Sequence, residues 1–271
     1  MMKLLEINSQ EYAVQIHQQD QRLPYVLMLH GFMGDHRVFD HLVEELSESC
    51  NPVAVDLLGH GASSKPADPL RYNENNQMDD IVAIINTLNL DPVFLYGYSM
   101  GGRLALKTAL HRPTLFNGLV LESTNCGISD PQKRKNRQKV DAARAQKIEE
   151  DFEQFLSNWN RLDLFKSPAP IEDTLVRKYQ DIQLEQSPKA LSASLFGFGT
   201  GSMSPVCNQL EKLDLPVLLI AGSEDEKYQQ INRSLVDQIP NATFSSIKAG
   251  HRTHLDNPAA VISEIHNFLE D

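Results

Sequence analysis

The sequence predicts an α/β fold in which helices flank a mostly parallel central sheet. Short, continuous apolar runs recur along the chain, which is typical of strands buried on both sides of a parallel sheet. Segments with apolar residues at helical spacing separate several of these runs. A long stretch without any such run interrupts the alternation and predicts an inserted helical block. The expected core strands are Tyr25–Leu29, Pro52–Val55, Val93–Tyr96, Leu119–Leu121 and Pro216–Ala221.

The remaining elements fit around these strands. Two short alternating segments, Lys3–Ile7 and Tyr12–Ile16, predict an edge hairpin at the start of the chain. Apolar side chains at helical spacing predict one helix from about residue 36 to residue 47 and another that ends at Leu88. A last strand is expected over Thr243–Ile247.

The interruption extends from Gly127 to about Pro205, with helices expected at 141–148, 152–159, 174–182 and 190–195. We therefore divide the chain into an α/β core, residues 1–126 and 206–271, and a helical insertion, residues 127–205. The insertion lies where a lid over an active site would be placed, and the alternative is a packing subdomain that contacts no ligand. Residues 133–147 carry seven lysines or arginines, most of which are expected on a solvated helix face.

Composition excludes several classes of protein. A chain of 271 residues that is 41% hydrophobic can bury a sizeable core, and no apolar run approaches the roughly 20 residues that a membrane-spanning helix needs. The N-terminus lacks the features of a signal peptide, so we expect a soluble, cytoplasmic protein. We also expect it to be a monomer or a weak homo-oligomer. The net charge of -11 argues against nucleic-acid binding and requires a local cluster of arginine or lysine for any anionic ligand.

Cysteines and histidines indicate neither a disulfide framework nor a metal site. Cys50, Cys126 and Cys207 form an odd, scattered set without C-x-x-C spacing, so we expect three free thiols. His251 and His254 form an H-x-x-H pair, but no third ligand stands at a recognisable spacing, so no metal is expected. His254 is expected to be structural.

The segment Gly97-Tyr98-Ser99-Met100-Gly101 follows the third core strand and opens onto a predicted helix. It matches the G-x-S-x-G nucleophile elbow, a strand-to-helix turn too tight for side chains on either flank, which projects the serine from the backbone. Ser99 would then stand at a helix N-terminus, where peptide dipoles favour developing negative charge. Short motifs recur by chance, and the alternative is an ordinary turn serine.

Partners for Ser99 follow in the chain order serine, acid, histidine. Asp225 and His251 each come just after a predicted strand, at the edge where open α/β sheets gather their ligand-binding groups. We expect Asp225 to orient His251, which in turn activates Ser99. Glu224 and Glu226 are the alternatives to Asp225 for this role.

Two backbone N–H groups would complete such a site. In enzymes with this elbow the oxyanion hole is formed by the residue after the nucleophile, here Met100, and by a loop after an earlier strand. His30-Gly31-Phe32 follows the first core strand, and Gly31 would let the backbone approach a substrate closely, so we assign the second N–H to Phe32. His60, between two glycines, is expected to make loop hydrogen bonds and not to act in catalysis.

Further segments, taken together with these motifs, indicate a particular family. They are Leu121-Glu122-Ser123-Thr124, Asn158-Trp159, Leu164-Phe165, Gly199-Thr200-Gly201 and Ala249-Gly250-His251. Together with the elbow, extended to Arg103, and with His30-Gly31-Phe32, they resemble a family of α/β hydrolase homologues from menaquinone biosynthesis. That family is the 2-succinyl-6-hydroxy-2,4-cyclohexadiene-1-carboxylate synthases, and the resemblance covers nearly the whole chain.

The resemblance implies the α/β-hydrolase fold with a helical lid, and a lyase without a cofactor. Enzymes of that family expel pyruvate from an enolpyruvyl cyclohexene that carries succinyl and carboxylate groups. It also implies that Tyr98, Arg103, Arg137, Trp159 and Phe165 bind this small polycarboxylate. The two arginines would hold its carboxylates, because guanidinium groups pair bidentately with them, and Trp159 and Phe165 would form an apolar wall.

At one position the chain departs from the family pattern. A third family arginine is replaced in the segment that begins at Gln183. Either Arg177 or Lys178, the nearby cations, substitutes for it, or the substrate differs from that of the family.

The implied mechanism uses the serine as a base. Ser99, deprotonated by His251, would remove the acidic proton beside the succinyl ketone, while the N–H groups of Phe32 and Met100 bind the enolate oxygen. The same triad could instead attack a carbonyl, as in an esterase or a C–C bond hydrolase. A non-catalytic ligand receptor is a third reading, which a complete triad disfavours.

Overall fold

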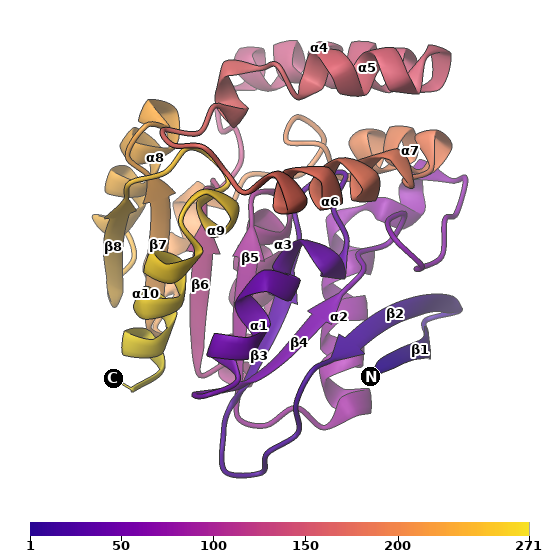
Figure 1. Ribbon diagram of the computed structural model, residues 1–271. Helices are drawn as coiled ribbons and strands as arrows, with labels where there is room; N and C mark the ends of the chain where they lie inside the picture. The colour runs from indigo at the N-terminus through magenta and orange to yellow at the C-terminus, as the bar shows by residue number, and fades with distance from the viewer. Residues whose placement is uncertain (271) are drawn as a thin grey trace.

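An eight-stranded sheet forms the centre of the protein in the computed structural model, which describes residues 1–270 (Figure 1). Its strands are β1 (Met2–Ile7), β2 (Gln10–Ile16), β3 (Tyr25–Leu29), β4 (Asn51–Val55), β5 (Val93–Tyr98), β6 (Gly118–Glu122), β7 (Val217–Gly222) and β8 (Ala242–Ile247). Their order is β1-β2-β4-β3-β5-β6-β7-β8. Neighbours among β3 to β8 are parallel, whereas β1 and β2 form an antiparallel hairpin at one edge. The predicted parallel sheet and edge hairpin are confirmed.

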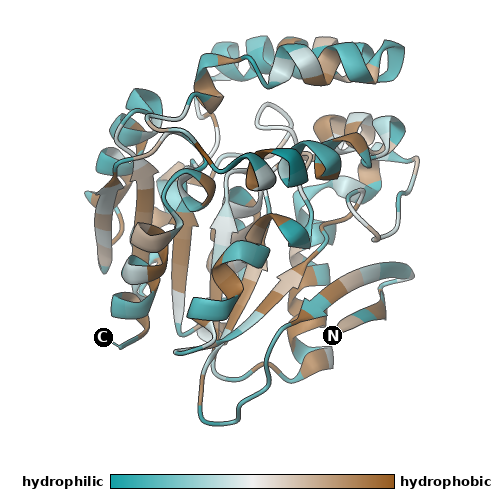
Figure 2. Ribbon diagram, in the orientation of Figure 1, coloured by the Kyte–Doolittle hydropathy of each residue, from teal (hydrophilic) through white to brown (hydrophobic). Residues whose placement is uncertain are grey.

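The sheet is covered on both faces by α1 (Asp40–Leu46), α2 (Glu74–Leu88), α3 (Met100–His111), α8 (Glu226–Val236), α9 (Thr253–Asp256) and α10 (Pro258–Glu270). Side chains alternate between the two faces along each strand. In β3, Leu27 and Leu29 pack in one apolar cluster with α2 and α3, whereas Val26 and Met28 pack in the other with α1 and α10. The apolar runs therefore contribute to a core on each face of the sheet, and Figure 2 shows much of the central strands in the brown of hydrophobic residues.

Short 3-10 helices connect several of these elements. They are η1 (His36–Phe39), η2 (Pro69–Tyr72), η3 (Pro113–Leu115), η4 (Asp163–Phe165) and η5 (Cys207–Lys212). The helix expected from residue 36 to residue 47 is divided into η1 and α1. Asp35 caps η1, because its carboxylate accepts a hydrogen bond of 2.9 Å from the Arg37 N–H.

Between β6 and β7 the chain forms α4 (Pro131–Glu150), α5 (Phe152–Trp159), α6 (Asp173–Leu184) and α7 (Pro188–Phe198). Figure 1 shows these helices at one end of the sheet, beyond the C-terminal ends of its parallel strands. α4, α5 and α7 share a small apolar cluster that includes Ile148, Phe155 and Leu191, and Met33 from the loop after β3 joins it. This cluster packs the insertion against the loop that follows the first core strand.

Helix α4 begins ten residues before the predicted start at residue 141. Most side chains of its first half are exposed and polar, so this half carries no apolar periodicity from which a helix could be predicted. Its start is instead set by Asp130, whose carboxylate accepts a hydrogen bond of 2.7 Å from the Lys133 N–H, and by Pro131 in the first turn.

A disulfide bond joins Cys126 and Cys207, whose Cα atoms lie 5.0 Å apart. The prediction of three free thiols is therefore wrong for these two, and only Cys50 is a free, buried cysteine among the described residues. The two cysteines are 81 positions apart in sequence and flank the helical insertion. They meet because the insertion leaves the core after β6 and returns to it at the same place, where the Val206 N–H donates to the Cys126 carbonyl at 2.8 Å.

Across residues 1–270, none of the helices is both long enough and apolar enough to cross a bilayer.

The disulfide generates a prediction about stability. Replacing both Cys126 and Cys207 by serine should lower the free energy of unfolding by about 2 to 4 kcal/mol, because the cross-link restricts the unfolded chain over a long loop. Urea denaturation without reductant measures the difference. A dithiol reductant should bring the wild type to the level of the double variant and leave the double variant unchanged. An unfolding midpoint of the wild type that does not respond to reductant would contradict the prediction.

Candidate active site

Ser99 occupies a junction of one residue between β5 and α3, in a backbone conformation that serine rarely adopts. Its φ is 52° and its ψ is -102°. A non-glycine residue in this region is strained, and such strain persists only where the surroundings enforce it. The Ser99 N–H donates to the Glu122 carbonyl at 2.8 Å, and the Thr124 hydroxyl donates to the Ser99 carbonyl at 2.7 Å. β6 and the loop after it thus hold both sides of the turn.

Glycines on either side of the turn permit a very close crossing of backbones. A Cβ added to Gly97 would lie 2.6 Å from the Gly101 carbonyl oxygen, and one added to Gly101 would lie 2.1 Å from the Leu29 carbonyl oxygen. Neither contact is possible for a larger residue without moving the main chain. The G-x-S-x-G pattern therefore has the steric basis that the sequence predicted.

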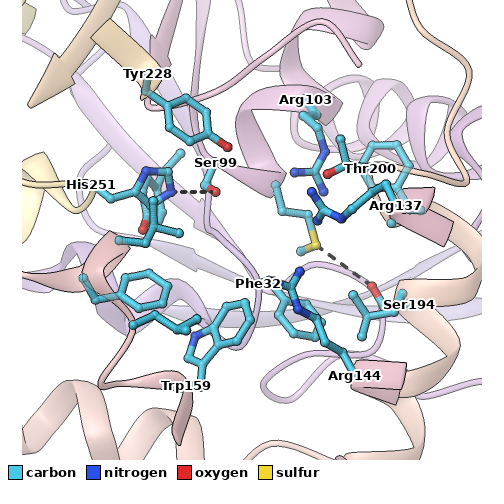
Figure 3. Close-up of a pocket in the computed structure, with 18 of the residues that line it drawn as sticks. Phe32, Ser99, Arg103, Arg137, Arg144, Trp159, Ser194, Thr200, Tyr228 and His251 are labelled. Atoms are coloured by element: carbon cyan, nitrogen blue, oxygen red, sulfur yellow. Dashed lines mark hydrogen bonds between the residues drawn. The ribbon is translucent and has the colours of Figure 1, made fainter. Parts of the chain in front are cut away.

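Ser99, His251 and Asp225 form one chain of hydrogen bonds. Ser99 Oγ lies 3.2 Å from His251 Nε2 (Figure 3), and His251 Nδ1 lies 2.6 Å from Asp225 Oδ2. Asp225 is buried and caps α8, whereas Glu224 and Glu226 are exposed. The geometry thus supports Asp225 over its two neighbours as the partner of His251.

The other histidines near the turn have different partners. His254 is fully buried, and its Nδ1 lies 2.9 Å from a carboxylate oxygen of Glu122. Burial alone would raise the pKa of Glu122, but the charge and hydrogen bond of His254 outweigh it and hold that pKa below its ordinary value. His60 is also buried, its Nδ1 lies 3.1 Å from the Leu58 carbonyl, and burial lowers its pKa to about 3, so its ring is neutral.

The two predicted oxyanion-hole residues lie in different elements: Phe32 in the loop after β3, and Met100 at the start of α3. Within residues 1–270, neither the Phe32 N–H nor the Met100 N–H donates to a protein acceptor. His30 orients the loop, because its Nε2 accepts from the Leu57 N–H at 3.0 Å and its Nδ1 lies 2.7 Å from the Gly31 carbonyl. Nδ1 therefore carries the proton and donates to Gly31, and burial keeps the ring neutral by lowering its pKa.

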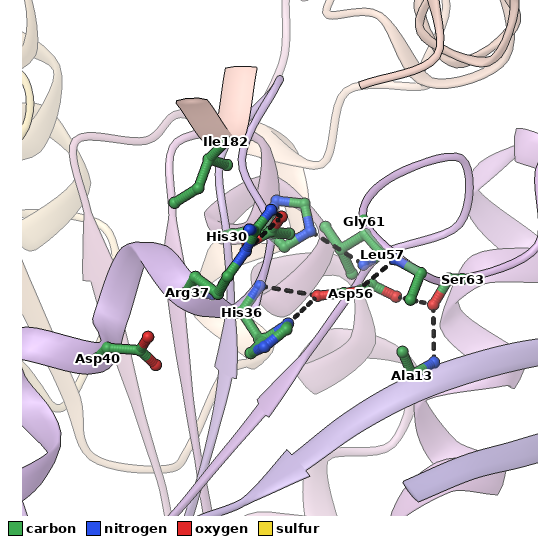
Figure 4. A network of polar contacts seen from close by, with 12 residues as sticks. Ala13, His30, His36, Arg37, Asp40, Asp56, Leu57, Gly61, Ser63 and Ile182 are labelled. Carbon is green, nitrogen blue, oxygen red and sulfur yellow. Dashed lines mark hydrogen bonds and ion pairs between the residues drawn. The ribbon is translucent and has the colours of Figure 1, made fainter. Parts of the chain in front are cut away.

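A second network ties this loop to the one after β4 (Figure 4). The Asp56 carboxylate accepts hydrogen bonds from the His36 N–H at 2.8 Å and the Ala62 N–H at 2.8 Å, and it lies 2.7 Å from His36 Nδ1. Burial alone would lower the pKa of His36, but the hydrogen bond and charge of Asp56 outweigh it and raise that pKa above its ordinary value. The pair fixes the start of η1 and, with it, the loop that carries Phe32.

A cavity opens directly over Ser99 (Figure 3). Aromatic side chains from the insertion form one wall. The Trp159 ring centroid lies 5.4 Å from that of Phe165 and 6.0 Å from that of Phe32, and Phe165 contacts the His251 ring in turn. All of the predicted site residues line the cavity except Asp225, which lies behind His251: Phe32, Tyr98, Ser99, Met100, Arg103, Arg137, Trp159, Phe165 and His251.

Comparison with known proteins identifies close relatives. Residues 24–258 match the family described as alpha/beta hydrolase fold. A 2-succinyl-6-hydroxy-2,4-cyclohexadiene-1-carboxylate synthase of Serratia proteamaculans (strain 568) is 30% identical over 253 residues, which cover 91% of this chain and 93% of the relative. A Bacillus subtilis (strain 168) protein that bears the same name provisionally is 35% identical over 246 residues, covering 90% of this chain and 89% of the relative.

The chain belongs to the 2-succinyl-6-hydroxy-2,4-cyclohexadiene-1-carboxylate synthase family of the α/β hydrolases. A solved structure agrees with this assignment. MenH from S. aureus superposes with a TM-score of 0.90 at 29% sequence identity, over 95% of this chain and 97% of that chain. The resemblance noted from the sequence motifs, including the α/β-hydrolase fold, is confirmed.

Arginines from two helices, α3 and α4, line the cavity over Ser99. Arg103 lies on α3, one turn beyond Ser99, and burial lowers its pKa to about 10. Arg137 lies on α4, where its Nε donates to Asp141 at 2.7 Å. Both are therefore placed where a carboxylate in the cavity can reach them.

Neither of the cations that the sequence offered in place of the third family arginine reaches the cavity. The Gln183 side chain is buried outside the cavity, where its amide oxygen accepts a hydrogen bond of 2.8 Å from Asn160. Arg177 is exposed, and Lys178 pairs with Asp40 at 2.7 Å. Neither cation lines the cavity.

Among the residues that line the cavity, several with polar or charged side chains were given no site role from the sequence. They include Arg144, Ser194, Thr200, Lys227 and Tyr228. For two of them, the spacing from a predicted site residue along the same helix could have indicated a place in the site. Arg144 stands seven residues after Arg137, which is two helical turns along the same face, and Tyr228 follows Asp225 by three residues in the first turn of α8. Of the other three, Ser194 lies within α7, Thr200 in the loop after it and Lys227 in the first turn of α8, and tertiary packing decides that they face the cavity.

The raised pKa of His36 predicts a pH dependence of stability. A histidine whose pKa is raised by folding stabilises the protein fully below its unfolded pKa of about 6.5, and this contribution is lost as the pH rises through the folded pKa. His36→Gln should therefore lower the free energy of unfolding more at about pH 6 than at about pH 8.5. Urea unfolding of both proteins across this range measures the difference. If the difference in unfolding free energy between the two proteins stays constant with pH, the prediction is wrong.

Proposed function

We propose that this protein is a lyase of menaquinone biosynthesis. In this proposal it eliminates pyruvate from 2-succinyl-5-enolpyruvyl-6-hydroxy-3-cyclohexene-1-carboxylate and forms 2-succinyl-6-hydroxy-2,4-cyclohexadiene-1-carboxylate. The names of its relatives support this reaction. The observation that carries the proposal is a serine–histidine–aspartate chain that opens into a cavity with guanidinium groups on its wall. A polycarboxylate needs such groups, all the more in a protein of net charge -11.

The first step is a proton transfer through the triad. His251 takes the proton of the Ser99 hydroxyl at Nε2, while Asp225 accepts the hydrogen bond of the Nδ1–H and stabilises the imidazolium. The Ser99 oxygen then removes the proton from the ring carbon beside the succinyl ketone. The enolate oxygen that forms accepts hydrogen bonds from the Phe32 and Met100 N–H groups.

Collapse of the enolate completes the elimination. The electron pair returns through the adjacent ring double bond and expels the enolpyruvyl group, which takes up a proton and becomes pyruvate. The ring double bond between C3 and C4 becomes a single bond as double bonds form between C2 and C3 and between C4 and C5, so the product is a conjugated 2,4-diene. These steps are proton transfers and bond shifts, so we assign no metal and no cofactor to them.

The arginines position the substrate and neutralise it. Arg103 is protonated at neutral pH even with a pKa of about 10, and it has already lost most of its hydration. A carboxylate that binds it replaces little water, so the charge-assisted hydrogen bond forms in a site of low dielectric. We assign Arg103 and Arg137 to the carboxylates, and Tyr98, Trp159 and Phe165 to the apolar walls of the site.

We assign residues 127–205 as a lid over residues 1–126 and 206–271, of which Asp271 lies outside the described residues. Arg137, Trp159 and Phe165 come from this segment, so the lid supplies three of the five residues that we assign to substrate binding. Closing such a lid would exclude water from the enolate. We further propose that the enzyme acts in the cytoplasm on its small-molecule substrate as a monomer or a weak homo-oligomer.

A serine-dependent esterase or C–C bond hydrolase is the second candidate. The strained elbow and the hydrogen bond between Ser99 and His251 favour it, because the same arrangement activates a serine for attack on a carbonyl. Arginines on the cavity wall disfavour a neutral ester as the substrate. A non-catalytic receptor is disfavoured by the intact chain from Ser99 to Asp225.

The decisive experiment is a direct assay of the elimination. The purified protein, without added metal or cofactor, should release pyruvate from the enolpyruvyl cyclohexene substrate and form a conjugated diene that absorbs in the ultraviolet. Lactate dehydrogenase with NADH measures the pyruvate. Activity on p-nitrophenyl esters should be weak by comparison. If pyruvate release does not exceed the uncatalysed rate while an ester or C–C substrate turns over, the hydrolase function replaces the lyase function.

Variants of the triad test the mechanism. Ser99→Ala and His251→Ala should each lower kcat by at least about a thousandfold without loss of the fold. Asp225→Asn should damage kcat far more than Glu224→Gln, its matched control, because only Asp225 sets the tautomer of His251. Circular dichroism checks the fold. Near-normal turnover of Ser99→Ala, or a larger defect in Glu224→Gln than in Asp225→Asn, would reassign these roles.

A further inference from the structure

Two arginines on α4 share a single buried carboxylate. Asp141 is 3% exposed, and its Oδ1 lies 2.7 Å from Arg137 Nε and 3.4 Å from an Arg144 guanidinium nitrogen. The two arginines are 28% and 30% exposed, so neither is a freely solvated side chain of the helix surface. One carboxylate balances the charge of only one guanidinium group, and the pair keeps a net positive charge.

A third guanidinium group increases this excess. The Arg103 side chain is buried, and its Nε has no hydrogen-bond partner among residues 1–270. Arg103, Arg137 and Arg144 all line the cavity over Ser99, and Figure 3 shows them together on the side away from His251. Buried charges normally have partners, because an unpaired buried charge is costly. The arrangement is that of a site whose balancing anions come from a ligand.

Arg144 is held in place by an aromatic ring. Its guanidinium carbon lies 5.2 Å from the centroid of the Trp159 ring, close enough for a cation–π interaction. Burial, together with the charge of Arg137, holds the pKa of Arg144 below its ordinary value. Both observations describe a side chain that is partly desolvated and fixed before any ligand binds, which reduces the entropy cost of binding.

We propose that Arg144 binds a carboxylate of the substrate and so completes a set of three guanidinium groups with Arg103 and Arg137. This inference rests on the proposed function, because it names a binding residue for the same polycarboxylate. It assigns the role to a residue of α4 and not to position 183, which lies outside the cavity. The substrate carboxylate supplies the negative charge that Asp141 alone cannot provide.

Kinetics separate a binding role from a structural one. Arg144→Gln should raise KM for the enolpyruvyl substrate by at least about tenfold, since a charged hydrogen bond is lost, and leave kcat nearly unchanged, since the contact exists before and during the reaction. Lys139→Gln removes the same charge from an exposed position of α4 outside the cavity and serves as the matched control. Equal KM values for the two variants would overturn the proposal.

Fluorescence tests the same site without turnover. Trp159 is the sole tryptophan of the chain, so intrinsic emission reports on the ring that contacts Arg144. At constant ionic strength, propane-1,2,3-tricarboxylate should change the emission of the wild type and of Lys139→Gln in a saturable way. Its neutral trimethyl ester should not. In Arg144→Gln, the concentration needed for half the change should rise by at least about tenfold.

The two experiments distinguish this inference from the proposed function. Tricarboxylate binding that depends on Arg144, without pyruvate release by the wild type, would remove the lyase function and keep Arg144 as an anion-binding residue. Pyruvate release by the wild type, with unchanged KM and unchanged tricarboxylate binding in Arg144→Gln, would keep the function and refute the role of Arg144.

Discussion

The crossing of α3 against β3 and β5 is the constraint on which the site depends. Gly101 lies so close to the Leu29 carbonyl that no side chain fits between them, and Ser99, two residues earlier in the same turn, has a strained backbone conformation. The same crossing places the Met100 N–H beside the serine and Arg103 one turn farther on. One steric requirement therefore positions the reactive oxygen, one donor for an oxyanion and one cation. The strain at Ser99 is offset by hydrogen bonds from β6 and the loop after it.

Charge within the cavity is organised against the charge of the whole protein. The surface of a chain with net charge -11 repels anions, whereas the cavity wall carries three guanidinium groups around the single carboxylate of Asp141. Concentrating cations in a partly dry site costs stability in the free protein, as the lowered pKa of Arg103 indicates. The aromatic ring of Trp159 and the carboxylate of Asp141 reduce this cost without cancelling it. Such a balance favours an anionic ligand over water.

The sequence was most informative where a local pattern has a local cause. The core strands and the elbow around Ser99 could be predicted, because burial on two faces and a tight turn restrict which residues are possible. The first half of α4 could not, since its helix depends on a cap and on neighbouring helices and not on an apolar face. The pairing of Cys126 with Cys207 and the position of Arg144 are set by how distant segments meet. The acidic partner of His251 was ambiguous in the sequence. Only the fold shows that Asp225 is buried whereas Glu224 and Glu226 are exposed.

The disulfide gives the helical insertion a single covalent stem. With Cys126 and Cys207 joined, the helices between them form a closed ring attached to the sheet at one place. A ring of this kind can tilt about its stem as a unit, but its two ends cannot slide past each other. For protein engineering, the segment between the cysteines is a natural cassette. Exchanging it as a whole with that of a relative would replace α4 to α7 together, while the junction with β6 and β7 keeps its geometry.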